Sequence, residues 1–316
     1  MVFFEGLFSI SGRDMDRIEA MSMLLAAVDA GSLSAAGRRL GVPLATISRK
    51  VSELEKHLNS RLLVRGGRRL ILTEAGHNYV ASCRRILDDI REAERTAAGE
   101  YRAPQGELVI SVPVVFGRTH VLPVLADFLR AYPDVQVRMQ QTDRIVNLLE
   151  DHVDLAVRVG TLPDSSLVAT RIGYVGRVLC ASPDYLARFG VPERPDDLKR
   201  HECIAFSALT PGDERWLFFK DGEDIVTDIR PRLIVNTAEA AVTAAAAGIG
   251  IARVLSYQVS AQVASGALAV VLADYEPASL PMSLVYPGQR QVPLKLRAFL
   301  DFAAPRLRER MGYQSL

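Results

Sequence analysis

The chain has 316 residues, of which 49 % are hydrophobic and 24 % are charged, a composition typical of a globular protein and not of a disordered one. No uninterrupted apolar run approaches the roughly 20 residues of a membrane helix, so we expect no membrane partner. The formal net charge is only +1, but basic residues gather near the N-terminus, and such local patches steer nucleic acids. The length suits a small module joined to a larger domain.

The three cysteines, Cys83, Cys180 and Cys203, lie far apart, without a CxxC pair or clustered histidines. This spacing argues against a zinc site and against a disulfide framework, so we expect no metal, no cofactor and a reducing cytoplasm. Cys180 and Cys203 are interpreted as small core residues, with redox sensing as the alternative. Residues 1–14 lack the basic region and long apolar stretch of a secretory signal, and we interpret them as an extension.

The pattern of the N-terminal segment predicts a helix-turn-helix. Apolar residues recur at helical spacing over 18–28, which predicts a first helix. Ser34 is expected to cap a second, short helix that ends at Gly41. Pro43 marks the start of a third helix, whose apolar positions continue over 47–58. Two short helices therefore meet across a glycine-containing turn.

A hairpin and a long helix are predicted next. Apolar residues 62–64 and 70–72 flank a basic, glycine-rich tip at 65–69, which indicates a β-hairpin that would form a wing. A long helix is predicted after Thr73, because side chains recur there in alternating steps of four and three, which is the seam of a coiled coil and favours a partner helix. The seam residues are Tyr79, Cys83, Ile86, Ile90, Ala93 and Ala97. Proline and glycine then break the helix over 101–106, the predicted domain boundary.

The following segments alternate between strand and helix. Strands are predicted over 108–112, 135–139 and 155–159, and helices over 121–131 and 145–150. This βαβ rhythm is typical of a parallel sheet covered by helices. Such sheets bind ligands beyond the carboxyl ends of their strands.

The remaining elements predict a second lobe and a return to the first, with two strands crossing as hinges. They are strands around Val178 and Ile204, a strand over 233–235, an alanine-rich helix over 239–247, a strand over 283–286 and a helix over 294–307. We expect a winged helix-turn-helix domain over 15–73, a linker and dimerisation helix over 74–103 and a two-lobed, ligand-binding domain over 104–316. Within the last, lobe I takes about 104–166 and 270–316, and lobe II takes about 167–269.

Several motifs resemble a known family. The motifs DAGSLSAA (29–36), LGV (40–42), ISR (47–49), LE (54–55), RLL (61–63) and LTEAG (72–76) resemble the DNA-binding domain of LysR-type transcription regulators. The motifs DLAVRVG (154–160), CASPDYL (180–186) and GIGIA (248–252) resemble the effector domain of the same family. The likeness is dense and covers nearly everything from Met15 onward.

The resemblance implies an α/β protein with an N-terminal winged helix-turn-helix rich in helices and a C-terminal, two-lobed domain like a periplasmic binding protein. It implies a repressor or activator in the bacterial cytoplasm, associated with the nucleoid, that pairs through its linker helix as a dimer or tetramer. The implied partners are double-stranded promoter DNA, a small organic effector between the lobes, a second copy of the chain and, as a further candidate, RNA polymerase.

The second helix of a helix-turn-helix lies in the major groove with its N-terminal residues toward the bases. Arg49 is the leading candidate, as a reader of bases or phosphates. Leu44 and Ala45 stand where Gln-Ser often opens this helix in the family. The predicted DNA-binding residues are Ser34, Arg38, Pro43, Leu44, Ala45, Thr46, Ser48, Arg49 and Lys50, with Arg65, Arg68 and Arg69 of the wing expected on the phosphate backbone.

Effector-binding candidates follow from the positions where strands hand over to helices. They are Pro113, Val114, Val115, Phe116, Thr142, Asp143, Asn236 and Thr237, joined by Phe206 and Ser207 from the second lobe. Turn-forming and packing roles explain these residues almost as well. Arg158 could pair with a ligand anion or with a structural carboxylate, whereas Trp216 is interpreted as core because three apolar residues follow it.

Three other functions compete with a regulator. An α/β enzyme would need a nucleophile elbow, a phosphate loop or an HExxH zinc motif, and the sequence contains none of them. A solute-binding protein would share the two-lobed domain but should carry an export signal. A nucleoid architectural protein would share the DNA-binding half but needs no ligand cleft. A sequence-specific, non-enzymatic regulator fits all of the motifs.

Overall fold

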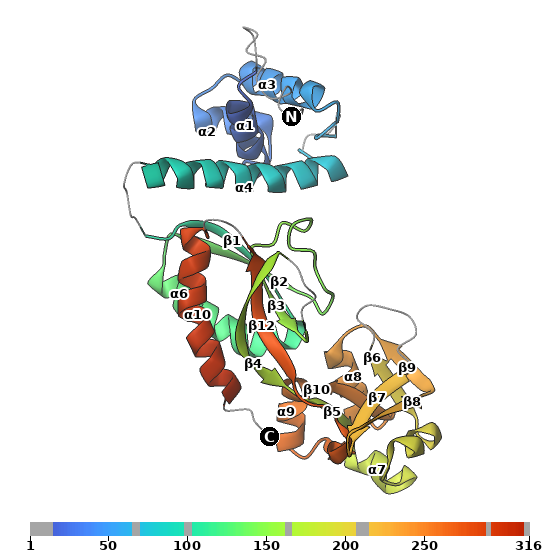
Figure 1. The fold of residues 1–316 in the computed structure, drawn as a ribbon. Coiled ribbons are helices and arrows are strands. Elements are labelled where there is room, and N and C mark those ends of the chain that lie inside the picture. Colours follow the sequence, from blue (N-terminus) through green and yellow to red (C-terminus); the bar gives the residue numbers. More distant parts are fainter. Residues whose placement is uncertain are drawn as a thin grey trace, which may run out of the picture. The chain divides into compact units, whose positions relative to one another are not determined.

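The computed structural model describes residues 15–64, 70–97, 103–161, 166–206, 215–288 and 292–312. The chain divides into two compact units, Met1–Arg102 and Ala103–Leu316 (Figure 1). Within the described ranges no single helix is long and apolar enough to cross a membrane, and α1 and α2 pass that test only together, across a bend of 114°.

The first unit is a cluster of helices. It consists of α1 (Arg17–Asp29), α2 (Leu33–Leu40), α3 (Leu44–His57) and the long α4 (Glu74–Ala97). Helix α1 contacts the other three. Its core contains the buried side chains of Ala20, Leu24, Ala36, Ile47, Val51, Leu54, Leu62 and Val80. The helical periodicity that the sequence shows in this region therefore marks the buried faces.

The cap of α2 differs from the sequence prediction. The side chain that accepts the amide hydrogen of Ala35, at 3.1 Å, is that of Ser32 and not that of Ser34. Ser34 already lies inside the helix and is exposed. Gly41 ends the helix in the left-handed region with φ 67°, as a C-cap glycine does. The helix therefore begins at Leu33, two residues earlier than a cap at Ser34 would give.

Two apolar stripes run along α4. Val80, Cys83 and Leu87 are buried, and Ile86 and Ala93 are exposed. Cys83 was predicted to belong to the seam for a partner helix, but its thiol is buried on the same side as Val80 and Leu87. Burial raises the pKa of the Cys83 thiol to about 11. The stripe left open on α4 is therefore narrower than the sequence suggested.

The base of the predicted hairpin is present as one antiparallel bridge between Leu63 and Leu72. The amide of Val64 also donates to the carbonyl oxygen of Ile71 at 2.9 Å. The tip at 65–69, with Arg65, Arg68 and Arg69, lies outside the described residues.

The second unit contains two five-stranded sheets (Figure 1). The first has the order β2-β1-β3-β12-β4, with β1 parallel to β2 and β3, and β12 antiparallel to β3 and β4. Its strands are β1 (Gly106–Val112), β2 (Val135–Gln141), β3 (Leu155–Val159), β4 (Leu167–Val175) and β12 (Leu280–Pro287). Parallel pairing at β1 is what places the ends of three strands at one edge.

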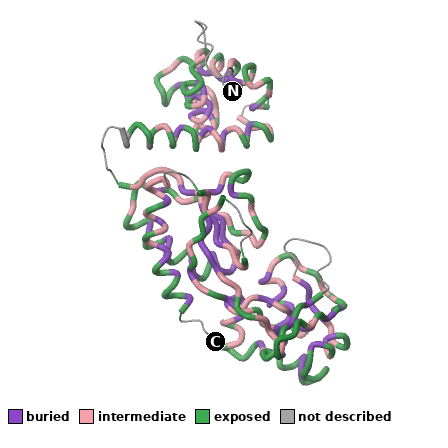
Figure 2. Tube along the Cα trace, viewed as in Figure 1, coloured by how far each residue is buried: buried purple, intermediate pink, exposed green. Residues whose placement is uncertain are grey.

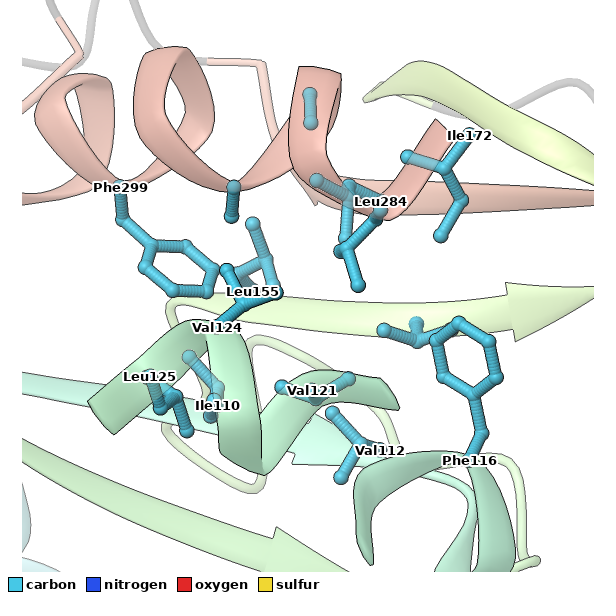
Figure 3. Close-up of a cluster of buried hydrophobic side chains, with 14 of the residues drawn as sticks. Ile110, Val112, Phe116, Val121, Val124, Leu125, Leu155, Ile172, Leu284 and Phe299 are labelled. Atoms are coloured by element: carbon cyan, nitrogen blue, oxygen red, sulfur yellow. The ribbon is translucent and has the colours of Figure 1, made fainter. Parts of the chain in front are cut away.

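Helices α6 (Leu122–Ala131) and α10 (Leu294–Gly312) pack on the first sheet, preceded by α5 (Val114–Phe116) and a π-helical turn over Gly117–Val121. Figure 3 shows the shared core, where Phe299 of α10 and Leu125 of α6 lie against Ile110 and Leu155 of the strands. Figure 2 shows the buried residues concentrated in the strands and on the inner helix faces.

The second sheet has the order β11-β5-β10-β6-β9. Its strands are β5 (Arg177–Ala181), β6 (Cys203–Phe206), β9 (Pro231–Val235), β10 (Ile251–Leu255) and β11 (Ala269–Val271). It is accompanied by the hairpin of β7 (Arg215–Lys220) and β8 (Glu223–Asp228), by helices α7 (Pro183–Phe189), α8 (Ala238–Ala246) and α9 (Ser256–Ala264), and by short 3-10 helices over Pro195–Arg200 and Ala273–Tyr275.

Trp216 belongs to the core of this second sheet, as predicted, with Phe218 beside it. Cys180 and Cys203 are buried free thiols, and burial raises the pKa of each to about 12. A thiol held protonated in an apolar core is unreactive, so the reading of these cysteines as core residues is confirmed over redox sensing.

Two segment predictions were wrong. Residues 145–150 form an irregular segment with a turn over 148–150 instead of a helix, because the Asp151 carboxylate accepts from the Asn147 amide and the Asn147 side chain accepts from the Leu149 amide. The second lobe was expected to begin near Leu167, but β4 pairs along its whole length with β12 of the first sheet. The chain passes to the second sheet at Gly176 and returns between β11 and β12.

Candidate functional sites

The N-terminal end of α3 is an exposed surface of the first unit. Pro43 precedes the helix without a side-chain cap, and Leu44 is 50 % exposed although it is apolar. Ala45 and Arg49 are exposed as well, whereas Ile47 on the opposite face is fully buried. One face of this helix thus anchors it in the core and the other presents its first two turns outward.

Arg49 and Lys50 in the first half of α3 differ in how their side chains are paired and exposed. Arg49 pairs with Glu53 one turn later at 3.0 Å, an exposed contact that contributes little and is easily exchanged. Lys50 pairs with Glu19 of α1, and its side chain is only 15 % exposed. Arg49 is therefore available to an anionic partner, whereas Lys50 is directed toward α1.

The other predicted DNA-binding residues flank this surface. Ser34 and Arg38 are exposed on α2, and Thr46 and Ser48 are half-buried on α3. Gly37 permits the close approach of α2 to the turn before α3, because a Cβ there would lie 2.8 Å from the carbonyl oxygen of Val42. The small residue at Gly37 therefore lets α2 and α3 pack closely across their turn.

The second unit contains a cavity of about 260 Å³ between elements of its two sheets. The first sheet contributes the ends of β1, β2 and β3 with the loop after β2, and the second contributes the ends of β6 and β10 and the first turn of α9. The lining residues are Ser111, Pro113, Thr142, Asp143, Arg144, Ile145, Val146, Ala156, Val157, Arg158, Val159, Thr161, Phe206, Leu255, Tyr257 and Gln258.

The predicted effector residues are distributed unevenly around this cavity. Pro113, Thr142, Asp143 and Phe206 line it. The next residues, Val114, Val115 and Phe116, form α5, and the last two are buried in the first core. Asn236 and Thr237 are not among the lining residues; Thr237 instead caps α8 by accepting from the Ala240 amide. Ser207 lies outside the described residues.

Sequence reasoning missed the contribution of α9. Leu255, Tyr257 and Gln258 line the cavity, and the amide of Leu255 donates to the side-chain oxygen of Gln258 at 2.8 Å. The signal was available, because β10 also hands over directly to a helix at Ser256. What the sequence does not show is that this strand end faces the ends of β1, β2 and β3.

Two charged side chains in the cavity wall have unused hydrogen-bonding atoms. Asp143 accepts from the Val114 amide through Oδ1 at 3.1 Å, but its buried Oδ2 has no partner. Arg158 donates from Nη2 to the Val146 carbonyl oxygen at 2.5 Å, but its buried Nε has no partner. Among the residues that the structure describes, neither side chain has an ion pair.

Burial dominates the electrostatics of the wall. It lowers the pKa of the Arg158 guanidinium, because the charged form loses solvation. Burial also raises the pKa of Tyr257, and the nearby negative charge of Asp143 raises it further. No group of three or more histidine, cysteine or acidic side chains that could hold a metal ion occurs within the described part of the chain.

Both units match family profiles. Residues 18–77 match the bacterial regulatory helix-turn-helix protein of the lysR family, and residues 102–308 match the LysR substrate binding domain. The chain is 35 % identical to an HTH-type transcriptional repressor of Pseudomonas aeruginosa over 91 % of each protein.

Solved structures of full-length regulators are also similar. CrgA, a LysR-type transcriptional regulator from Neisseria meningitidis, is 31 % identical with a TM-score of 0.58, covering 92 % of this chain and 98 % of CrgA. The N100E variant of AphB is 28 % identical with a TM-score of 0.62, covering 91 % of this chain and 98 % of that one. The chain therefore belongs to the LysR family of transcription regulators, with a DNA-binding helix-turn-helix and an effector-binding domain.

Proposed function

We propose that two copies of the chain pair through α4 and present their α3 helices to a partly palindromic promoter site. The open stripe of Ile86 and Ala93 on α4 supports pairing, because exposed apolar residues at helical spacing favour a partner helix. Two-fold symmetry in a protein is mirrored by a palindrome in its DNA site. Pairs of dimers would form a tetramer, and RNA polymerase would be a further partner at the promoter.

The proposal assigns residues 15–73 to DNA binding, 74–103 to pairing and 104–316 to effector binding. A bacterial transcription regulator works in the cytoplasm, and we place this one at the nucleoid. An effector in the cavity would favour one arrangement of the assembly over another, because a ligand shifts an equilibrium toward the state that binds it better. The two states would bend or space the DNA differently.

The observation that carries the DNA-binding role is the exposed start of α3. Arg49 is free enough to bridge the O6 and N7 atoms of guanine, the commonest specific contact of arginine. Leu44 and Ala45 are apolar and exposed, which favours contact with the methyl group of thymine over hydrogen bonds to base edges. Lys50 has a lesser role, because its ammonium already pairs with Glu19.

The remaining predicted residues would contact the sugar-phosphate backbone of the DNA. Hydroxyl groups of Ser34, Thr46 and Ser48 and the guanidinium of Arg38 are suited to phosphate oxygens. Arg65, Arg68 and Arg69 of the wing would add ionic contacts, and each neutralised phosphate would steepen the salt dependence of binding. In the cavity, Pro113, Thr142, Asp143 and Phe206 would contact the effector.

Selection of genomic DNA fragments by the purified full-length protein, at two salt concentrations, tests this function. We expect a recurrent dyad in which a T and an A are separated by a spacer, including sites upstream of the protein's own gene. Salt-sensitive binding without any motif would overturn the proposal and leave a non-specific architectural protein.

The Leu44→Gln variant sharpens the same experiment. A glutamine at this position can bond adenine N6 and N7 in bidentate fashion, so we expect the preferred base at one position of each half-site to change from T to A. Lys56→Ala, an exposed change at the other end of α3, is the matched control and should leave the motif intact. An unchanged motif in Leu44→Gln would remove Leu44 from the base contacts.

A further inference from the structure

Two opposite charges lie in the wall of one cavity without neutralising each other. Asp143 follows β2 and Arg158 is the next-to-last residue of β3, and these strands flank β1 on either side. The register places Gln141 beside Val112 and Ala156 beside Ser111, so both residues lie just beyond the same level of β1. Two strand spacings separate their backbones by about 10 Å.

This separation leaves room for a molecule between the two side chains. Over the described ranges of the chain, neither Asp143 nor Arg158 forms an ion pair within 4.0 Å, and each keeps one buried polar atom without a partner. Buried polar atoms are nearly always satisfied in folded proteins, so two unsatisfied atoms in one cavity wall are suited to hydrogen bonds with a polar ligand. An arginine Nε is a donor and a carboxylate Oδ2 is an acceptor.

The rest of the wall restricts the size and polarity of that ligand. Pro113, Ile145, Val146, Val157 and Leu255 are apolar, and Phe206 adds an aromatic ring. The volume of about 260 Å³ lies just below the range of roughly 300 to 1,000 Å³ that drug-sized ligands occupy. The cavity therefore suits a small molecule with an apolar body and polar ends.

We propose that the effector is a small organic monoacid whose carboxylate binds Arg158 and whose hydroxyl or ammonium group donates a hydrogen bond to Asp143 across the cavity. This inference rests on the proposed effector role of the cavity and adds the chemical class of the ligand. An arginine without a carboxylate partner matches a ligand anion, and planar guanidinium groups bind carboxylates with high specificity. The uncompensated Asp143 excludes a second carboxylate at the opposite end.

Two matched probe series test the class by calorimetric titration of the full-length protein. One series is 4-hydroxyphenylacetate, phenylacetate and 4-hydroxyphenylacetamide, and the other is 5-hydroxypentanoate, pentanoate and 5-hydroxypentanamide. In at least one series the hydroxy acid should bind tenfold or more tightly than both its amide and the acid that lacks the hydroxyl group. If amides bind as well as acids, or if no acid in either series binds, the proposed class is wrong.

Variants test which side chain binds each end of the ligand. Arg158→Gln should weaken binding of the hydroxy acid at least tenfold, and Asp143→Asn should abolish the preference for the hydroxy acid over its counterpart without the hydroxyl. Arg138→Gln is the matched control, since Arg138 is exposed on β2 and is not among the lining residues, and it should change affinity less than threefold. Arg144→Gln tests the other arginine of the lining, which is exposed. A loss in Arg144→Gln and not in Arg158→Gln would overturn the assignment. The acid and amide comparison on the unmodified protein stands even if Arg158→Gln fails to fold.

A separate variant distinguishes failure of the class from failure of the site. Ile145 is exposed at the cavity wall, so Ile145→Trp should reduce cavity space without disturbing a core. If neutral molecules bind and Ile145→Trp blocks them, the cavity remains the effector site and only the acid class is wrong. If an acid binds equally well to Ile145→Trp, the cavity is not its site and the proposed effector role fails.

Discussion

The two units of this chain build their functional surfaces in different ways. The DNA-binding surface comes from one helix of 14 residues and the short helix before it. The cavity draws on strand ends and loops from Ser111 to Gln258. A surface on a single helix is fixed by local periodicity and caps, whereas a cavity between sheets depends on which strands become neighbours. The first unit should therefore be sensitive to changes within one helix, and the second to changes in long-range contacts.

The largest expected effect tests whether the units are independent. Leu54 is fully buried in α3, so Leu54→Ala should destabilise the first unit by about 2 to 5 kcal/mol. Differential scanning calorimetry should show one transition lowered and the transition of the second unit unchanged. Leu44→Ala, in the same helix but half exposed, is the control and should change little. A single transition that shifts as a whole would show that the two units do not unfold independently.

The second unit should respond to mild acid through a buried histidine. His120 is buried against Phe116, and burial, with a smaller contribution from Arg310, lowers its pKa to about 4. The unfolded chain binds this proton near pH 6.5 and the folded chain does not. The free energy of unfolding should therefore fall as the pH drops from about 6.5 to about 4, by up to about 3 kcal/mol.

The control for this prediction is His120→Gln, which cannot take up the proton. Chemical denaturation at several pH values should give a flatter dependence for the variant than for the unmodified protein. Equal pH dependence in both proteins would show that His120 is not the group responsible.

An intermediate effect concerns base recognition. Arg49→Ala should weaken binding to the selected dyad by about 1 to 3 kcal/mol more than binding to random DNA, because a bidentate contact to guanine is lost. Gel-shift titrations on both DNAs measure the difference, with Lys56→Ala as the control on the same helix. An equal loss on both DNAs would make Arg49 a phosphate contact.

The smallest expected effect separates two neighbouring serines. Ser32→Ala removes the cap of α2 and should cost about 0.5 to 2 kcal/mol of stability in the first unit. Ser34→Ala should change stability less, because the Ser34 hydroxyl contacts only that of Ser32. Thermal denaturation of both variants measures the difference. A larger loss of stability in Ser34→Ala than in Ser32→Ala would show that Ser34 is the capping residue.

Features that depend on local patterns could be predicted from the sequence, whereas features that depend on long-range contacts could not. Helical periodicity located α1, α3 and α4, and strand and turn signals located β1, β2 and β3, because these patterns are local. The helix expected over 145–150 was wrong, since the side chains of Asn147 and Asp151 bond nearby backbone amides and compete with a helix. Tyr257 was missed because its place beside Asp143 depends on contacts across more than a hundred residues.

Almost the whole cavity wall lies on strand ends and loops, above the core of Phe128, Leu284 and Phe299 that holds the first sheet to its helices. Substitutions at Thr142, Ile145 or Phe206 therefore alter what the cavity accepts without removing a side chain from that core. Ligand preference and folding stability can then change separately during evolution. Such a scaffold can acquire a new signal in few mutational steps while its response to DNA stays intact.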